Sequence, residues 1–162
     1  MAANAKLRED TVCINRLLRT FGYLRPISGV VHTHTMAWEA IELGRNLKYD
    51  PIQKMLVVKH EGSYFVHLTL QFKRTALDTV SSRMKVLLKS ATLELHSCEV
   101  ELPAGGRSVM PVTKSCWGMI PSLKRGSRLC AQMIVHAEMD RVFGWKLLSN
   151  ESGFWIVRVD GL

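Results

Sequence analysis

Two histidines, His32 and His34, are separated by one residue in a segment that begins with two valines. Side chains at alternate positions of a β-strand point to the same face, so both imidazoles would share one side of a strand. Such a pair can ligate zinc, but a zinc site needs a third and usually a fourth ligand. No neighbouring residue and no downstream Glu-His pattern supplies one, and we interpret the pair as surface or interface histidines.

The four cysteines, at positions 13, 98, 116 and 130, form no Cys-x-x-Cys pair and no zinc spacing. Cys116 and Cys130 each stand in an expected strand beside the same connection, so a disulfide between them is geometrically possible. Two buried free thiols are the alternative, because a free cysteine behaves as a small apolar side chain. Cys13 and Cys98 have no evident partner, and Cys13 is a candidate for a bond between chains.

No pattern of reactive residues indicates catalysis. The sequence has no nucleophile elbow, no cysteine-protease signature, no phosphate-binding loop and no dinucleotide fingerprint. The acidic residues in Glu99-Val-Glu101 and Asp140-Arg141 are more simply solvated strand faces than catalytic carboxylates. We therefore expect a protein that is not an enzyme and that needs no cofactor or metal.

Length and charge set further limits. With 162 residues, 47% of them apolar, the chain fits one folded domain with a large core. The net charge of +8 would favour nucleic acid, heparin-like polyanions or an anionic cell surface, but no basic run of five residues occurs. A solvated basic surface is the simpler interpretation, and we expect no nucleic-acid partner. No apolar run reaches the roughly 18 residues of a membrane span, which predicts a soluble domain.

One segment has helical spacing and the rest of the chain predicts strands. Apolar residues keep a helical period over Lys6 to Thr20, which indicates a short helix or an N-terminal stalk. From Pro26 onward, short apolar or alternating runs alternate with turn-rich patches, as is typical of an antiparallel sandwich or barrel. These runs are 30–31, 55–58, 64–72, 84–88, 92–95, 109–112, 129–135 and 154–159.

The run from Gly62 to Phe72 predicts a long strand with both faces occupied. One face is apolar and predicts core: Tyr64, Val66, Leu68 and Leu70. The other face begins with a large apolar residue and then turns polar: Phe65, His67, Thr69 and Gln71. A face of this kind suits contact with a partner subunit better than contact with water alone, so the sequence favours an association module.

Several motifs resemble those of the tumour necrosis factor homology domain. In the first half these are Trp38-Glu39, Asn46-Leu-Lys-Tyr49 and the segment from Met55 to His67, which ends in Gly-x-Tyr-Phe-Val-His. In the second half they are Trp117-Gly118, Leu123-Lys-Arg-Gly-Ser-Arg-Leu129 and the closing segment from Gly153 to Asp160. The resemblance covers about residues 26 to 160 and is specific in the combination of motifs.

This resemblance implies an all-β fold, a jelly-roll β-sandwich of two antiparallel sheets that assembles as a homotrimer. It implies a homology domain over residues 26–162, preceded by a leader or stalk remnant over residues 1–25. The implied subunit contact contains Phe65, His67, Thr69 and Trp117, with Phe154 or Trp155 nearby. Strand alternation allows only one of these last two side chains to face inward. A bridge that some members carry at this connection favours the Cys116–Cys130 disulfide.

The resemblance also implies a function, that of an extracellular, cytokine-type ligand. It would bind and cluster cysteine-rich tumour necrosis factor receptors, as a secreted protein or as the ectodomain of a type II membrane protein. The short loops are similar to those of the costimulatory branch that includes the 4-1BB ligand. The expected receptor contacts are Arg74, Arg83, Arg107 and Lys146, and Asn150 begins an N-glycosylation pattern, Asn-Glu-Ser.

Two alternatives remain open at this point. Most family members have an aromatic residue where this chain has Ser152, at the trimer axis, so a dimer is the alternative assembly. The rival classes are a complement-head-like trimeric recognition module, without the collagen-like leader, a basic β-barrel that binds polyanions or nucleic acid, and a small hydrolase or isomerase, which would need a convergent polar pocket. The second of these would need exposed aromatics interleaved with Lys and Arg.

Overall fold

A computed structural model describes residues 21–77, 79–105, 110–137 and 141–159. The expected helix over Lys6 to Thr20, Cys13 and Arg107 lie outside these described residues. Within them, nearly all regular structure is β-strand, and the helical exception is the short 3-10 turn η2 (Ser149–Glu151). No helix in this part of the chain is long and apolar enough to span a lipid bilayer.

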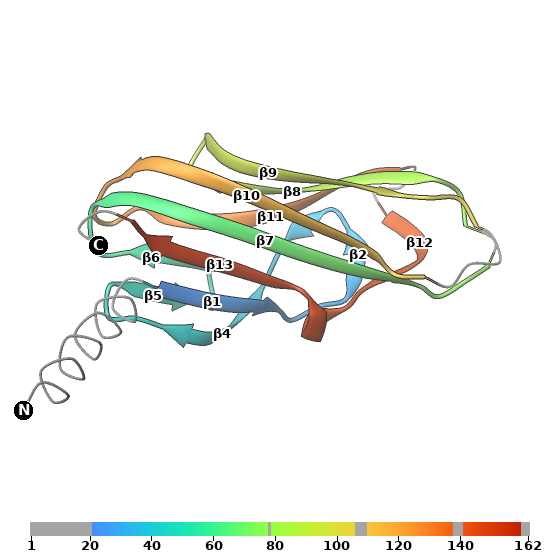
Figure 1. Cartoon of the computed structure of the whole chain (residues 1–162), viewed down its shortest axis with the longest axis horizontal. Coiled ribbons are helices and arrows are strands. Elements are labelled where there is room, and N and C mark those ends of the chain that lie inside the picture. Colours follow the sequence, from blue (N-terminus) through green and yellow to red (C-terminus); the bar gives the residue numbers. More distant parts are fainter. Residues whose placement is uncertain (1–20, 78, 106–109, 138–140, 160–162) are drawn as a thin grey trace, which may run out of the picture.

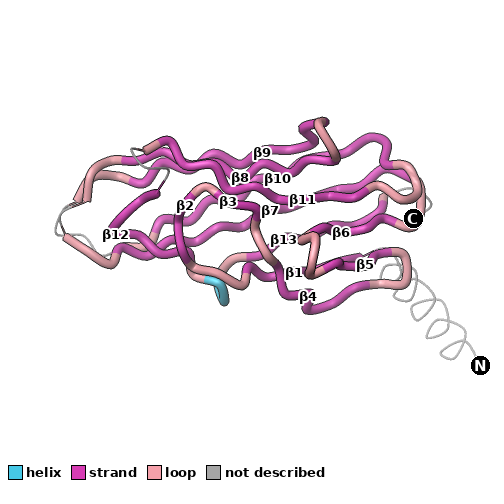
Figure 2. Tube along the Cα trace, turned by 180° about the vertical axis from the view of Figure 1, so that it is seen from behind, coloured by secondary structure: helices cyan, strands magenta, loops and turns pink. Residues whose placement is uncertain are grey.

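The strands form two antiparallel sheets that face each other in a jelly-roll sandwich (Figure 1). The seven-stranded sheet contains β1 (Phe21–Pro26), β2 (Val30–His32), β4 (Trp38–Leu43), β7 (Gly62–Arg74), β10 (Val112–Leu123), β12 (Arg141–Leu147) and β13 (Gly153–Arg158). The six-stranded sheet contains β3 (His34–Thr35), β5 (Leu47–Asp50), β6 (Met55–Val58), β8 (Ser82–Ser90), β9 (Leu93–Leu102) and β11 (Arg128–His136). It is seen from its outer side in Figure 2. The expected all-β sandwich is confirmed.

The core lies between the two sheets, and β7 supplies its centre. The inward side chains of β7, from Tyr64 to Phe72 at every second position, are fully buried. The hydroxyl of Tyr64 is satisfied by donating a hydrogen bond to the carbonyl oxygen of His60 at 2.6 Å. The intervening side chains of β7 lie on the outer face of the seven-stranded sheet and are only partly covered. The two-sided character predicted for this strand is therefore confirmed.

Four strands of the seven-stranded sheet, β1, β4, β10 and β12, were not expected from the sequence at their observed positions, and β1 and β10 are the two that matter for the site. β1 begins at Phe21, five residues before the expected domain boundary at residue 26, and it pairs with both β13 and β4. β10 runs over twelve residues, although only residues 109–112 had strand spacing. It is an edge strand, and Pro121 lies where its register with β7 shifts, so its pattern of alternation is broken.

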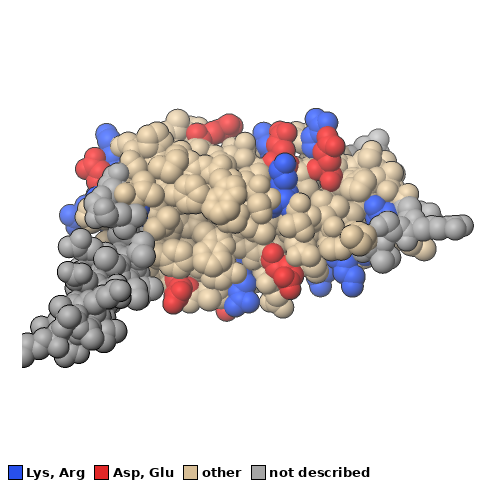
Figure 3. Space-filling model, in the orientation of Figure 1, with Lys and Arg blue, Asp and Glu red and all other residues tan. Residues whose placement is uncertain are grey.

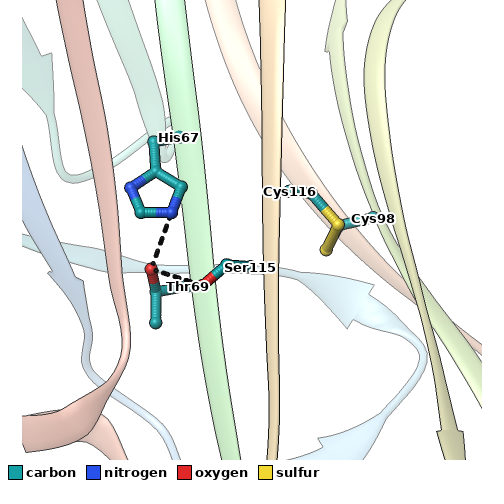
Figure 4. The surroundings of a disulfide bond; sticks show 5 residues. All are labelled: His67, Thr69, Cys98, Ser115 and Cys116. Atoms are coloured by element: carbon teal, nitrogen blue, oxygen red, sulfur yellow. Dashed lines mark hydrogen bonds between the residues drawn. A yellow bond between two sulfur atoms is a disulfide. The ribbon is translucent and has the colours of Figure 1, made fainter.

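The expected disulfide between Cys116 and Cys130 is wrong. Cys116 is bonded to Cys98 instead, with their Cα atoms 5.6 Å apart (Figure 4). β10 and β11 do flank one connection, but β10 pairs with β7 in one sheet and β11 pairs with β8 in the other. The connection therefore crosses between the sheets, and Cys130, near the turn, remains a buried free thiol.

The Cys98–Cys116 bond closes one open side of the sandwich. Cys98 lies on β9, the last strand of the six-stranded sheet, and Cys116 lies on β10, at the edge of the other sheet. Close packing beside it joins the same two strands, because a Cβ at Gly118 would lie 2.4 Å from the His96 ring. The disulfide thus fixes β10 against β9 across the core.

Candidate functional site

The outer side of the seven-stranded sheet carries a row of four rings, one from each of four neighbouring strands. In register across the sheet, β1 contributes Tyr23, β13 contributes Trp155, β7 contributes His67 and β10 contributes Trp117. The Tyr23 and Trp155 rings stack with their centroids 4.0 Å apart, and the His67 and Trp117 rings stack at 3.6 Å. The pleat therefore assembles a continuous aromatic row from residues that are far apart in the sequence.

A second, apolar row lies beside the first. Phe21, Val157, Phe65 and Met119 are in register on the same four strands. Phe65 lies 5.1 Å from Trp117 between ring centroids, and Phe21 lies 5.5 Å from Trp155. We call these two rows, eight residues in all, the aromatic face: Phe21, Tyr23, Phe65, His67, Trp117, Met119, Trp155 and Val157.

A polar row borders the aromatic face on its other side. Gly153, Thr69 and Ser115 are in register there, and the Thr69 hydroxyl lies 3.1 Å from Nε2 of His67 and 3.5 Å from Oγ of Ser115 (Figure 4). Ser152 lies at this border, is buried, and accepts a hydrogen bond from the backbone N–H of Gln71 at 3.0 Å. Ser152 thus ties η2 to β7.

The aromatic face is exposed and hollowed. Trp117 is 61% exposed, Met119 51% and Trp155 39%. A hollow of about 660 Å³ lies over the face and reaches Asn150 and Glu151 of η2. In Figure 3 a broad area left of the centre shows no charged residue, and charged residues lie above, below and to the right of it. Contiguous exposed apolar surface of this kind marks a contact with another molecule.

Most of the expected interface residues lie together on this face. Phe65, His67, Trp117 and Trp155 belong to it and Thr69 borders it. Phe154 is the exception: it is 2% exposed and packs in the core against Trp38, with ring centroids 5.9 Å apart. The prediction of Phe154 as an interface residue was wrong, because the alternation of β13 directs Trp155 outward and Phe154 inward.

Burial lowers the pKa of His67 below its ordinary value of 6.5. Among the described residues that line the hollow, the other charged or titratable groups are those of Tyr23 on β1 and Glu151 on η2. His67 is therefore held as a neutral ring that stacks on Trp117 at neutral pH.

We expect the free energy of unfolding to decrease as the pH falls below about 6.5, in part through His67. The pKa of His67 is lower in the folded chain than in the unfolded chain, so the unfolded chain binds the proton first as the pH falls. The contribution of His67 to the free energy of unfolding is therefore fully present above the unfolded-state pKa, and it is lost as the pH falls through the folded-state pKa. Urea unfolding at pH 8 and pH 5.5 would measure this loss, and His67→Gln should reduce it. His34, whose pKa burial also lowers, would account for what remains. Equal pH dependence in both proteins would remove His67 from the explanation.

Gly153 leaves room for the Tyr23 ring. A Cβ at position 153 would lie 2.6 Å from Cε2 of Tyr23, so alanine must displace that ring and disturb its stack on Trp155. We expect Gly153→Ala to shift the emission of Trp155 while the core remains folded. The chain has four tryptophans, so the same Gly153→Ala substitution is also made in a Trp155→Phe variant, where the part of the shift that comes from Trp155 should be absent. If Gly153→Ala shifts the emission equally with and without Trp155, or does not shift it at all, the close packing of Tyr23 is contradicted.

Three of the expected receptor contacts, Arg74, Arg83 and Lys146, are not part of the aromatic face. Arg74 donates from Nη2 to the carbonyl oxygens of Pro103 and Ala104, at 3.2 and 3.1 Å, and its guanidinium lies 4.8 Å from the Trp145 ring centroid. Arg83 forms an exposed ion pair with Glu101 at 3.3 Å. Lys146 on β12 and Asn150 on η2 are exposed.

Sequence reasoning missed half of the aromatic face. Phe21 and Tyr23 stood in the expected leader, although Phe-Gly-Tyr-Leu-Arg-Pro alternates in burial as a strand should. Met119 and Val157 were not assigned to a face. The His32–His34 pair was assigned to no chemistry, and its rings stack 4.0 Å apart, with Nδ1 of His34 2.7 Å from the carbonyl oxygen of His32. No third metal ligand joins them in the described part of the chain.

The fold has clear counterparts among solved structures. Murine APRIL, in a crystal structure at pH 5.0, is similar with a TM-score of 0.60 at 15% identity, covering 86% of this chain and 98% of that chain. A second murine APRIL structure, at pH 8.0, gives a TM-score of 0.57 at 13% identity. Eiger TNF from S. frugiperda gives a TM-score of 0.56 at 14% identity, covering 88% of this chain and 94% of that chain.

The likeness is one of structure. No protein-family model matches the sequence, and no curated protein matches it. APRIL and Eiger TNF are both ligands of the tumour necrosis factor superfamily. This chain therefore has the jelly-roll fold of the tumour necrosis factor superfamily ligands.

Proposed function

We propose that this chain is a cytokine-type ligand that assembles with copies of itself through the aromatic face and clusters cysteine-rich receptors of the tumour necrosis factor receptor family. The observation that carries the proposal is the aromatic face itself. Its residues expose indole and apolar surface on a sheet whose opposite side already covers the core, so a monomer would leave that surface in water.

A homotrimer is the assembly that the shape of the face supports. β10 is an edge strand, and it carries the two most exposed residues of the face, Trp117 and Met119. The edge of one protomer can therefore pack against the β1–β13 part of the next, which is a heterologous contact that closes into a ring. A dimer, in which the same patch meets itself, is the alternative arrangement.

The proposed activity is receptor clustering without catalysis. Several receptor sites on one assembly raise the effective concentration for each further binding event, which produces avidity without new contacts. The Cys98–Cys116 disulfide suits an oxidising, extracellular setting, either as a secreted protein or as the ectodomain of a type II membrane protein. Costimulatory immune signalling is the response that we propose, and Asn150, exposed on η2 at the rim of the hollow, would carry a glycan directed away from the subunit contact.

The proposed receptor contacts are Arg74, Arg83, Arg107 and Lys146. Arg74 and Arg83 already hold local partners, so among the described residues we assign the freer contact to Lys146. Arginine suits this role because it forms bidentate pairs with carboxylates of an acidic receptor.

We expect Arg107→Glu to weaken receptor binding by about tenfold, as loss of a charged contact does, while the assembly keeps its mass. The measurement is binding of soluble chain to a panel of cell-displayed receptor ectodomains of the family. Lys89→Glu, a reversal on the β8 strand of the other sheet, is the control. Equal affinity of Arg107→Glu and the unaltered chain would remove Arg107 from the contact, and failure to bind any receptor in the panel would overturn the proposed function.

A further inference from the structure

A second surface, at one end of the sandwich, gathers exposed positive charge on three neighbouring turns. These are the turn between β4 and β5, the connection between β6 and β7, and the turn between β10 and β11, all at the left end of Figure 1. We propose that this surface binds a sulfated polysaccharide of the cell surface or matrix. We call it the basic end and define it by four residues: Arg45, Lys59, Lys124 and Arg125.

Backbone hydrogen bonds join the three turns into one scaffold. The N–H of Lys59 donates to the carbonyl of Asn46 at 2.8 Å, which places Lys59 beside the turn that carries Arg45. The N–H of Gly126 donates to the carbonyl of Val58 at 2.7 Å, and the N–H of Val58 donates to the carbonyl of Ser127 at 2.9 Å. The positive charges are thus carried by turns that are fixed to one another, although they are up to 80 residues apart in the sequence.

The β10–β11 turn directs its two cations outward. The N–H of Ser127 donates to the carbonyl of Lys124 at 3.0 Å, and Gly126 has a φ of 89°, which is the geometry of a type II turn with glycine at its third position. Lys124 and Arg125 occupy the first two positions of this turn and both are exposed. A positive φ at Gly126 also explains why the sequence has glycine there.

The basic end is not neutralised by the described chain. None of its four cations forms an ion pair in the described residues. Glu61 is an exposed carboxylate on the same connection, and its backbone carbonyl accepts a hydrogen bond from Nε of Arg158 at 3.0 Å. Two arginines elsewhere in the described chain are paired, Arg83 with Glu101 and Arg128 with Asp50.

The chemistry of the surface favours a sulfated polysaccharide over other polyanions. Insertion into an anionic membrane would require exposed apolar side chains between the cations, and the exposed large apolar residues of the described chain all lie outside these three turns. Stacking on single-stranded nucleic acid would require exposed aromatic rings there, and these lie on the aromatic face instead. The disulfide of an oxidising compartment also fits a partner found outside the cell.

The test compares two variants of equal charge. In one, the basic end is neutralised as R45Q/K59Q/K124Q/R125Q; in the other, four cations elsewhere are neutralised as K73Q/K85Q/K114Q/K146Q. Binding to heparin is measured at about 0.15 M NaCl, where exposed charges more than about 8 Å apart are screened. We expect the first variant to bind about 30-fold more weakly than the unaltered chain, since each exposed contact contributes modestly, and the second to change by less than about threefold.

Four outcomes would overturn the proposal. These are no heparin binding by the unaltered chain, equal losses in the two variants, equal binding to fully desulfated heparin, and tighter binding to duplex DNA or to phosphatidylserine vesicles. Circular dichroism checks that both variants are folded. The proposal does not depend on self-association, because the basic end and the aromatic face share no residue, and the solution mass of the first variant should equal that of the unaltered chain.

Discussion

Trp117→Glu should convert the assembly into folded monomers. Trp117 is 61% exposed in the single chain, so its replacement removes little from the core and the fold should survive. In the assembly the same residue would be buried, and each protomer would then bring one carboxylate into an apolar contact. A buried tryptophan anchor contributes about 2 kcal/mol or more to binding, and an unpaired buried charge costs several more. We therefore expect subunit affinity to fall by at least about 100-fold.

The chain offers a matched control for this substitution. Phe143 on β12 is 63% exposed, has an aromatic ring and lies outside the aromatic face. Phe143→Glu adds the same charge at the same exposure and should leave the solution mass unchanged. If both variants dissociate, general charge repulsion would explain the effect; if neither does, the aromatic face is not the subunit contact.

Removal of the Cys98–Cys116 disulfide should give the largest loss of stability. The double variant Cys98→Ala/Cys116→Ala releases a bond between residues 18 apart in sequence, and loop closure of this length corresponds to about 3 kcal/mol. For a domain of this size, the loss corresponds to a decrease in Tm of about 6–12 °C. Because the bond also fixes β10 against β9, the position of Trp117 should loosen and subunit affinity should fall with stability.

Reductant distinguishes this bond from other thiol effects. Reduction should lower the Tm of the unaltered chain by a similar amount and leave the double variant unchanged. Cys130→Ala is the control: the thiol is buried and free, so its removal should cost only about 1 kcal/mol of packing and leave the response to reductant intact. A reductant response that disappears in Cys130→Ala and persists in the double variant would contradict the observed pairing.

The parts of the fold that followed from the sequence are those with strict alternation. Both faces of β7 could be predicted because its apolar side chains occur at every second position. A shift of the strand by one residue would turn this apolar set away from the core, so only one register is possible. The sequence did not show which of Phe154 and Trp155 faces the core, because both side chains are large and apolar. Only the packing of Phe154 on Trp38 identifies the inward one.

The disulfide and the extent of the site required non-local information. Cysteine pairing depends on which sheet each strand joins, and the sequence around Cys116 and Cys130 does not reveal that their connection crosses the sandwich. Phe21 and Tyr23 were missed because the helix-like spacing before them extended the expected leader into β1. The basic end was missed for a related reason, since its cations are divided among three turns far apart in the sequence and form no long basic run.

The most direct test of the proposed assembly is the solution mass of the unaltered chain, measured by multi-angle light scattering with and without reductant. One chain has a mass of 18.3 kDa. A mass of three chains in the oxidised protein would agree with the account, and a mass that reductant leaves unchanged would exclude a bond between chains through Cys13 as its cause. A monomer at micromolar concentration, with the aromatic face exposed to water, would contradict it.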